Sequence, residues 1–142
     1  MTRQTLQPAH WARPKGYANG VAVRGTQVFV AGMIGWDAQR HFHSDDLVEQ
    51  VRQALQNVVE VLAVASAKPE HIVRMTWYLV DRREYLLRMK EIGAVFRDVI
   101  GGFDMAMTAI EVRALIEDRA KVEIEVTAVM PDSAPIHERR TL

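Results

Sequence analysis

The sequence predicts an α+β fold in which two helices cover one face of a mixed β-sheet, and three features of the chain indicate it. Two long segments repeat apolar residues at helical spacing, and several shorter segments alternate or are rich in β-branched residues. These segments follow one another in the order strand, strand, helix, strand, helix, strand, strand. Because two helices cover only one sheet face, we expect the other face to meet a neighbouring subunit in a closed cyclic oligomer.

Composition limits the number of domains and the classes of partner. With 142 residues and 49% hydrophobic content, residues 1–142 are expected to form a single domain with one core. Eighteen basic residues balance eighteen acidic ones, which argues against a nucleic acid or an anionic membrane as a partner. The absence of cysteine excludes disulfides and thiolate chemistry and is typical of a reducing compartment. No apolar run resembles a signal peptide or a membrane span, so we expect a cytoplasmic protein.

The first third of the chain is predicted to contain an irregular arm followed by a hairpin. Residues 1–20 are polar and contain two prolines and two glycines, so this arm should carry no regular element. Residues 21–23 and 27–31 are predicted as two short strands joined by a tight turn. Glycines follow at once, so residues 31–36 are either a plain strand end or a segment that lines a cavity.

Two helices and a central strand are predicted in the middle of the chain. Asp46 with Glu49 three residues later forms a capping-box pattern, which predicts a helix that starts there and ends before Pro69. Its apolar stripe consists of Leu47, Val51, Leu55, Val58, Leu62 and Ala65. Residues 71–80 are rich in β-branched and aromatic residues and are predicted as a central strand. A second amphipathic helix is predicted over residues 83–100, where two glycines end it.

Residues 106–130 are predicted as a pair of strands joined by a short charged connection. In the second strand Val122, Ile124, Val126 and Ala128 share one face, and Lys121, Glu123, Glu125 and Thr127 share the other. The two glutamates are either solvated on an exposed sheet face, or one of them faces a cleft and holds a proton or a water. Residues 131–142 are predicted to form a mobile tail.

The sequence offers little support for metal, nucleophile or cofactor chemistry. His41 and His43 lie two residues apart with Asp45 and Asp46 close behind, but no second ligand cluster with a recognised spacing accompanies them. We therefore expect two solvated loop histidines and no metal site. No serine lies in a nucleophile-elbow context and no glycine pattern is suited to phosphate, so no cofactor is expected.

Five segments carry a shared pattern: residues 15–20, residues 30–34, the helix end LQNVVEVLAVASA, the strand MTWYLVD and the closing strand KVEIEVTAV. Together they resemble the Rid family of reactive-intermediate imine and enamine deaminases, also called YjgF-like proteins. The resemblance covers roughly residues 15–130. It implies a chorismate-mutase-like fold and a homotrimer, in which three sheets form a barrel, the helices lie outside and small-molecule clefts lie between adjacent subunits.

The resemblance also implies a site, and this chain departs from it. In deaminating members an arginine binds the substrate carboxylate and a glutamate handles the water that hydrolyses the C=N bond, without metal or cofactor. Tyr17 and Glu123 match the family's cleft tyrosine and its glutamate, and are the candidate catalytic residues. Met107 stands in the place of the arginine, Ala31 in that of a frequent serine and Met89 in that of a frequent asparagine.

The remaining residues expected in the cleft are Gly32, Met33 and Thr108. A methionine cannot neutralise a carboxylate, and an unpaired buried anion is costly. The methionines at positions 33, 89 and 107 should therefore give a soft, apolar cleft.

No arginine nearby on the same strand can take over the missing contact. Arg113 shares a face with Met107, but strand geometry places it about 20 Å away. Arg74 or Arg88 entering from another direction remains an alternative.

Two hypotheses on function follow. The first is a diverged Rid-family protein that is not an ordinary 2-imino acid deaminase and binds or processes a less charged small molecule. The second is an active imine or enamine deaminase whose substrate carboxylate is held by another group. A ribonuclease role, also attached to this family, is disfavoured by the net charge of zero.

Overall fold

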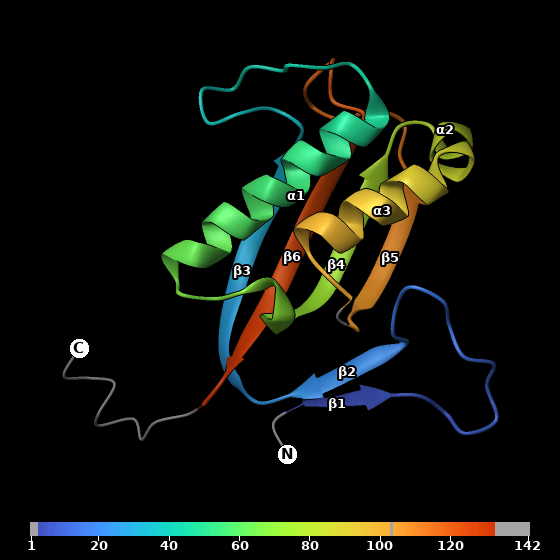
Figure 1. The fold of residues 1–142 in the computed structure, drawn as a ribbon, viewed down its shortest axis with the longest axis vertical. Coiled ribbons are helices and arrows are strands. Elements are labelled where there is room, and N and C mark those ends of the chain that lie inside the picture. The colour runs from blue at the N-terminus through green and yellow to red at the C-terminus, as the bar shows by residue number, and fades with distance from the viewer. Residues whose placement is uncertain (1–2, 103, 133–142) are drawn as a thin grey trace.

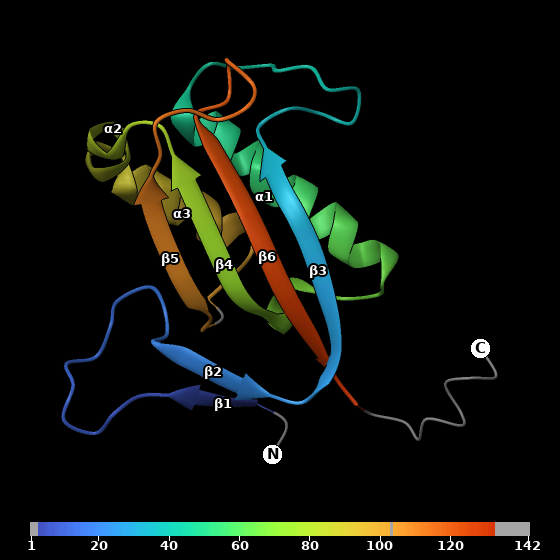
Figure 2. The ribbon, with the colours of Figure 1, turned by 180° about the vertical axis from the view of Figure 1, so that it is seen from behind.

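The structure, a computed structural model, describes residues 3–102 and 104–132. Its main sheet has four strands in the order β3-β6-β4-β5, and the helices lie on one face of it (Figure 1, Figure 2). The strands are β1 (Arg3–Leu6), β2 (Gly20–Val23), β3 (Gly25–Ile34), β4 (Ile72–Leu79), β5 (Ala106–Glu111) and β6 (Val122–Pro131). The helices are α1 (Leu47–Val64), the short 3₁₀ helix η1 (Pro69–His71), α2 (Arg82–Leu87) and α3 (Met89–Val99). The predicted α+β fold with helices on one sheet face is confirmed.

The main sheet is mixed, as predicted, but its last two strands do not pair with each other. β6 runs antiparallel to both β3 and β4, whereas β4 and β5 are parallel. β4 therefore separates β5 from β6, and the expected pairing of the two strands within residues 106–130 is wrong. The alternation of apolar residues fixes which face of a strand is buried but does not fix its neighbour. β6 has hydrogen-bonded neighbours on both edges, so it lies inside the sheet while β5 forms an edge.

The N-terminal arm contains a strand that the sequence did not predict. Residues Arg3–Leu6 form β1, which pairs antiparallel with β2 below the end of the main sheet where β4 and β5 begin (Figure 1). The Arg3 guanidinium fixes this strand to the domain, because it donates to the backbone oxygens of Glu70 at 2.9 Å, Ile72 at 3.0 Å and Asp104.

The prediction for the N-terminal arm is wrong in part, and the prediction for the C-terminal tail stays untested. Residues 1–20 are not irregular throughout, and β2 and β3 do not form the predicted hairpin because their partners are β1 and β6. Residues 133–142 lie outside the described residues, so the predicted mobility of the tail from residue 131 stays a prediction.

The first helix agrees with its prediction and the second is divided. The Asp46 side chain caps α1 and accepts a hydrogen bond from the backbone N–H of Glu49 at 3.2 Å. The predicted helix over residues 83–100 is broken at Arg88, whose φ of −106° and ψ of 11° are not helical, so that α2 and α3 are separate helices. Within the described residues, none of the helices combines the length and the hydropathy needed to cross a membrane.

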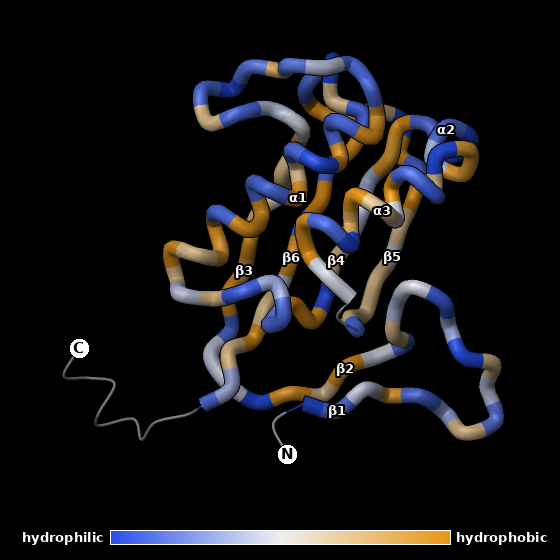
Figure 3. Tube along the Cα trace, in the orientation of Figure 1, coloured by the Kyte–Doolittle hydropathy of each residue, from blue (hydrophilic) through white to orange (hydrophobic). Residues whose placement is uncertain are grey.

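The core lies between α1, α3 and the covered face of the sheet. Hydrophobic and hydrophilic residues both occur along α1 and along β6, because each element has one face toward the core (Figure 3). Val122, Ile124, Val126 and Ala128 of β6 are all buried, as their alternation predicted. One polar side chain, Gln50 of α1, is also buried at 1% exposure. Its amide donates to the backbone oxygen of Arg119 at 2.9 Å and accepts from Lys121 N–H at 2.8 Å, which ties the helix to the segment before β6.

Candidate functional site

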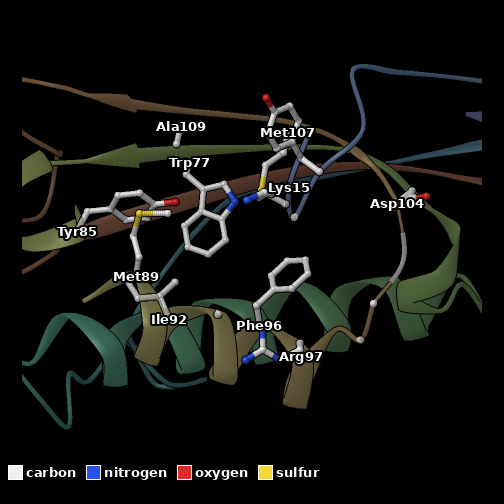
Figure 4. A pocket seen from close by; sticks show the side chains of 15 residues that line it. Lys15, Trp77, Tyr85, Met89, Ile92, Phe96, Arg97, Asp104, Met107 and Ala109 are labelled. Atoms are coloured by element: carbon white, nitrogen blue, oxygen red, sulfur yellow. The ribbon is translucent and has the colours of Figure 1, made fainter. Parts of the chain in front are cut away.

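A cavity of about 490 Å³ lies beside the edge strand β5, on the face of the sheet that the helices cover (Figure 4). Strands β4 and β5 form one wall, α2 and α3 the other, and the segment before β2 contributes a third side. Its lining includes the side chains of Tyr17, Trp77, Tyr85, Met89, Phe96 and Met107. The cavity volume falls within the range of roughly 300 to 1,000 Å³ that is usual for small-molecule sites.

Three of the residues expected at the cleft, Tyr17, Met89 and Met107, line this cavity. Met107 pairs with Met75 of β4, which is fully buried under the helices, so Met107 projects from β5 toward the same face. Met89 is the first residue of α3. Tyr17 is held near β5 because its neighbour Ala18 forms a parallel bridge to the first residue of that strand.

Glu123 lies on the opposite, uncovered face of the sheet. Its neighbours along β6 are buried under the helices, whereas Glu123 and Gly32 line a separate hollow together with Tyr78 and Glu125. A Cβ atom built on Gly32 would lie 2.2 Å from Glu123 Oε1, so the carboxylate rests against the glycine backbone. Tyr78 donates its hydroxyl hydrogen to Glu125, and this bond raises the pKa of the Tyr78 phenol. Within one chain, the two candidate catalytic residues are therefore on different faces.

The other four expected cleft residues do not line the cavity. Ala31 and Gly32 occupy the irregularity between Val30 and Met33, where the pairing of β3 with β6 shifts, and both are exposed. Met33 is half-buried and packs against the core. Thr108 is exposed and follows Met107 in the strand, so it projects to the uncovered face.

Comparison with known proteins identifies the family. The sequence model of the family described as Endoribonuclease L-PSP matches residues 10–130. A 2-iminobutanoate/2-iminopropanoate deaminase of Salmonella typhimurium is 31% identical over 113 residues, which is 80% of this chain and 86% of that protein. The chain belongs to the Rid family. A RutC family protein of Aquifex aeolicus is 30% identical over 116 residues, covering 80% of this chain and 87% of its own length.

Solved structures of Rid proteins share the fold. The crystal structure of YyfB, a Rid protein of unknown function from Yersinia pestis, superposes with a TM-score of 0.80 at 29% identity and covers 92% of this chain and all of its own. The resemblance predicted from the residues is thereby confirmed, and with it the YjgF-type fold.

Neither arginine considered as a substitute for the Rid arginine reaches the cavity. Arg74 is exposed and adjoins the buried Met75 in β4, so it projects to the uncovered face. Arg88 lies at the break between α2 and α3, where its guanidinium contacts Asp46 Oδ1 at 2.9 Å and Glu91 Oε1 at 2.7 Å. These two carboxylates raise the pKa of Arg88 well above its usual value. Arg88 therefore joins the cap of α1 to α3 and is not available to a ligand.

We expect the Arg88 cluster to make stability depend on pH in acid. The guanidinium lowers the pKa of both Asp46 and Glu91, so these carboxylates stabilise the fold above their unfolded pKa values, near 4. That contribution is lost as the pH falls through the lower folded values. Arg88→Met should be less stable than the native protein at pH 7, and the difference should shrink toward pH 3. Urea midpoints measured between these values check this.

A matched control for the Arg88 experiment is Arg52→Met. Arg52 contacts Asp98 at 2.6 Å, but that pair lies at the surface, where removal of one partner has little effect. A difference between native protein and Arg88→Met that stays constant from pH 7 to pH 3 would show that the arginine acts by packing alone.

Both histidines of the loop before α1 contact the Asp37 carboxylate, His43 through its ring and His41 through its backbone N–H. His43 Nε2 lies 2.6 Å from Asp37 Oδ2, and the same carboxylate accepts backbone hydrogen bonds from His41 and Gln39. The bond from the His41 N–H is the main cause that lowers the pKa of Asp37 to about 2. In the part of the chain that the structure describes, no three His, Asp or Glu side chains are grouped as metal ligands would be.

The sequence reasoning missed the aromatic wall of the cavity. Trp77 of β4 forms contacts with Tyr85 of α2, at 6.3 Å between ring centroids, and with Phe96 of α3, at 6.5 Å. The signals were present as the tryptophan in MTWYLVD and as the aromatic positions on the apolar stripe of the second predicted helix. Such a stripe is usually core, and only the position of β4 beside an edge strand exposes it to a cavity.

Proposed function

We propose that this Rid-family chain binds a small molecule with little or no charge in the cavity of Tyr17, Met89 and Met107, and that it is not an ordinary 2-imino acid deaminase. One observation carries the proposal. Met107 stands where deaminating members of the family are expected to have an arginine, and its side chain lines a cavity whose large side chains are mainly thioether and aromatic groups, while its charged lining residues are Lys15, Arg97 and Asp104. A carboxylate placed against the thioether and aromatic groups would lose its hydration without gaining a bidentate partner.

A second candidate function is favoured by Lys15 and Arg97. Both residues line the same cavity, and neither forms an ion pair within residues 3–102 and 104–132. Arg97 lies beside Gly93 one turn earlier in α3, where its Nη1 is 3.4 Å from a Cβ atom built on the glycine. A carboxylate held by these cations would make the protein an imine or enamine deaminase with a relocated anchor.

The proposal includes assembly as a trimer with its clefts between subunits. Glu123 and Met107 lie on opposite faces of the sheet within one chain. A site that contains both residues therefore needs Glu123 from one chain and Met107 from another. Two apolar side chains on the uncovered face, Phe29 at 71% exposure and Ile110 at 43%, support burial of that face by a neighbour. Light scattering should give three times the mass of 16.1 kDa. A monomer at micromolar concentration would contradict this part.

The test of function is ammonia release from freshly generated 2-iminopropanoate and 2-iminobutanoate. We expect the native protein to give no rate above spontaneous hydrolysis, with a Rid deaminase as the positive control. Turnover that is lost in Lys15→Met or Arg97→Met would overturn the proposal in favour of the second candidate.

The proposal places the protein in the cytoplasm, because a sequence without cysteine is typical of a reducing compartment. The net charge of zero gives no support to an RNA substrate.

A further inference from the structure

The cavity wall contains a buried hydrogen-bond donor without a partner. Trp77 is 2% exposed, and its indole Nε1–H is the side-chain group that stays unpaired among the buried nitrogens and oxygens of the described residues. The edge of the indole that carries this nitrogen is turned toward Met107 and Lys15, across the cavity from α3 (Figure 4). Buried donors are nearly always paired, so an orphan on a cavity wall indicates that something else supplies the acceptor.

The surroundings of this donor define what the acceptor can belong to. Phe96 lies 6.5 Å from the Trp77 ring at an interplanar angle of 36°, and Tyr85 lies 6.3 Å away at 62°. The phenol of Tyr85 is neutral at pH 7 and burial raises its pKa further, so these three aromatic side chains carry no charge, while the charged lining residues of the cavity are Lys15, Arg97 and Asp104. Flat rings pack well against tilted and edge-on aromatic groups of this kind.

The Met107 side chain, which lies on the side of the indole nitrogen, is adaptable (Figure 4). Met107 and Met89 both line the cavity, and unbranched thioether side chains change rotamer at little cost. A ligand that displaces the Met107 side chain would reach the Nε1–H. An arginine at position 107 would instead place a positive charge beside the indole nitrogen.

We propose that Trp77 determines ligand specificity, and that the cavity takes a flat, neutral aromatic molecule whose carbonyl oxygen accepts a hydrogen bond from the indole Nε1–H. This inference rests on the proposed function, in which the cavity binds a molecule of little charge. It adds the class of ligand and the residue that selects it. Trp77 acts by binding the ligand and takes no part in bond making or breaking.

Three probes of nearly equal size test the inference on the native protein: acetophenone, ethylbenzene and benzoate. Acetophenone and ethylbenzene differ in the carbonyl group alone, and benzoate adds a negative charge. We expect acetophenone to bind about tenfold more tightly than ethylbenzene, which is the effect of one buried hydrogen bond. Benzoate should bind least tightly. Calorimetry or ligand-observed NMR gives the three dissociation constants.

The matched variants are Trp77→Phe, which keeps an aromatic ring and removes the donor, and Trp36→Phe as the control. Trp36 lies against Phe42 in the loop before α1, away from the cavity. In Trp77→Phe, acetophenone should fall to the affinity of ethylbenzene, while the affinity for ethylbenzene stays within about twofold. In Trp36→Phe all three affinities should be native.

Three other outcomes of the probe experiment would each refute a different part of the inference. Equal binding of acetophenone and ethylbenzene to the native protein would refute the role of Trp77 and leave the apolar site standing. Tightest binding of benzoate would refute the proposed function itself. No binding of any probe at millimolar concentration would refute the cavity as a site for such ligands. The comparison of probes on the native protein decides the matter even if Trp77→Phe does not fold.

Discussion

Met107→Arg is expected to make this protein hydrolyse 2-imino acids, raising kcat/KM for 2-iminobutanoate about a hundredfold from a native value that is hidden beneath spontaneous hydrolysis. The new guanidinium would project from β5 into the cavity beside Tyr17, since the side chain it replaces lines that cavity. Two charge-assisted hydrogen bonds to the substrate carboxylate, each worth roughly 1.5 kcal/mol, give a gain of that size. Ammonia release from freshly generated imine, corrected for spontaneous hydrolysis, measures it.

The control for this experiment is Thr108→Arg. Thr108 adjoins Met107 in β5 but projects to the uncovered sheet face, so the variant carries the same charge on the same strand outside the cavity. It should show the native rate. An equal gain in both variants would mean that net charge rather than position promotes hydrolysis. No gain in Met107→Arg, with the fold intact, would mean that position 107 is not where a substrate carboxylate binds.

The sequence predicted those parts of the fold that depend on local pattern. The cap at Asp46 and the apolar stripe of α1 are local signals, and both agree with the structure except at Ala65, which is exposed at the C-cap. The alternation in β6 correctly assigned its buried and open faces. The predicted strand neighbours were wrong because pairing depends on contacts between residues far apart in the sequence. In the sheet, β4 lies between β5 and β6. β1 was missed for the same reason, since Arg3 anchors it to backbone groups about 70 and 101 residues away.

The sequence indicated which residues belong to the candidate site but not how they lie relative to one another. Resemblance to the Rid family singled out Tyr17, Met89 and Met107, which line one cavity, and Glu123, which does not. The sequence assigned faces strand by strand, but the relation between β5 and β6 depends on their order in the sheet. Trp77 could not be singled out either, because a tryptophan in a central strand is ordinary core. The role proposed for Trp77 depends on its unpaired indole nitrogen, which can be recognised only from the packing of the folded chain.

Gly35→Ala is expected to destabilise the fold by about 3 kcal/mol, which is at the upper end for overpacking. Gly35 follows β3 and lies against α1. A Cβ atom added there would lie 2.6 Å from Gln50 Cβ and 2.7 Å from its Cα. Because the Cα belongs to the helix backbone, α1 itself would have to move. That movement would also strain the buried hydrogen bonds of Gln50 to Arg119 and Lys121, at 2.9 and 2.8 Å. Urea denaturation gives the free energy of unfolding.

Gly102→Ala provides the control, because a Cβ atom at that position would have no heavy atom within 4 Å. Its effect should stay within about 0.5 kcal/mol. Equal losses in both variants would mean that backbone freedom of glycine, rather than close packing on α1, sets the requirement at position 35. A large loss in Gly35→Ala alone would show that the glycine at position 35 serves close packing on α1, whereas the one at position 32 makes room for the Glu123 carboxylate.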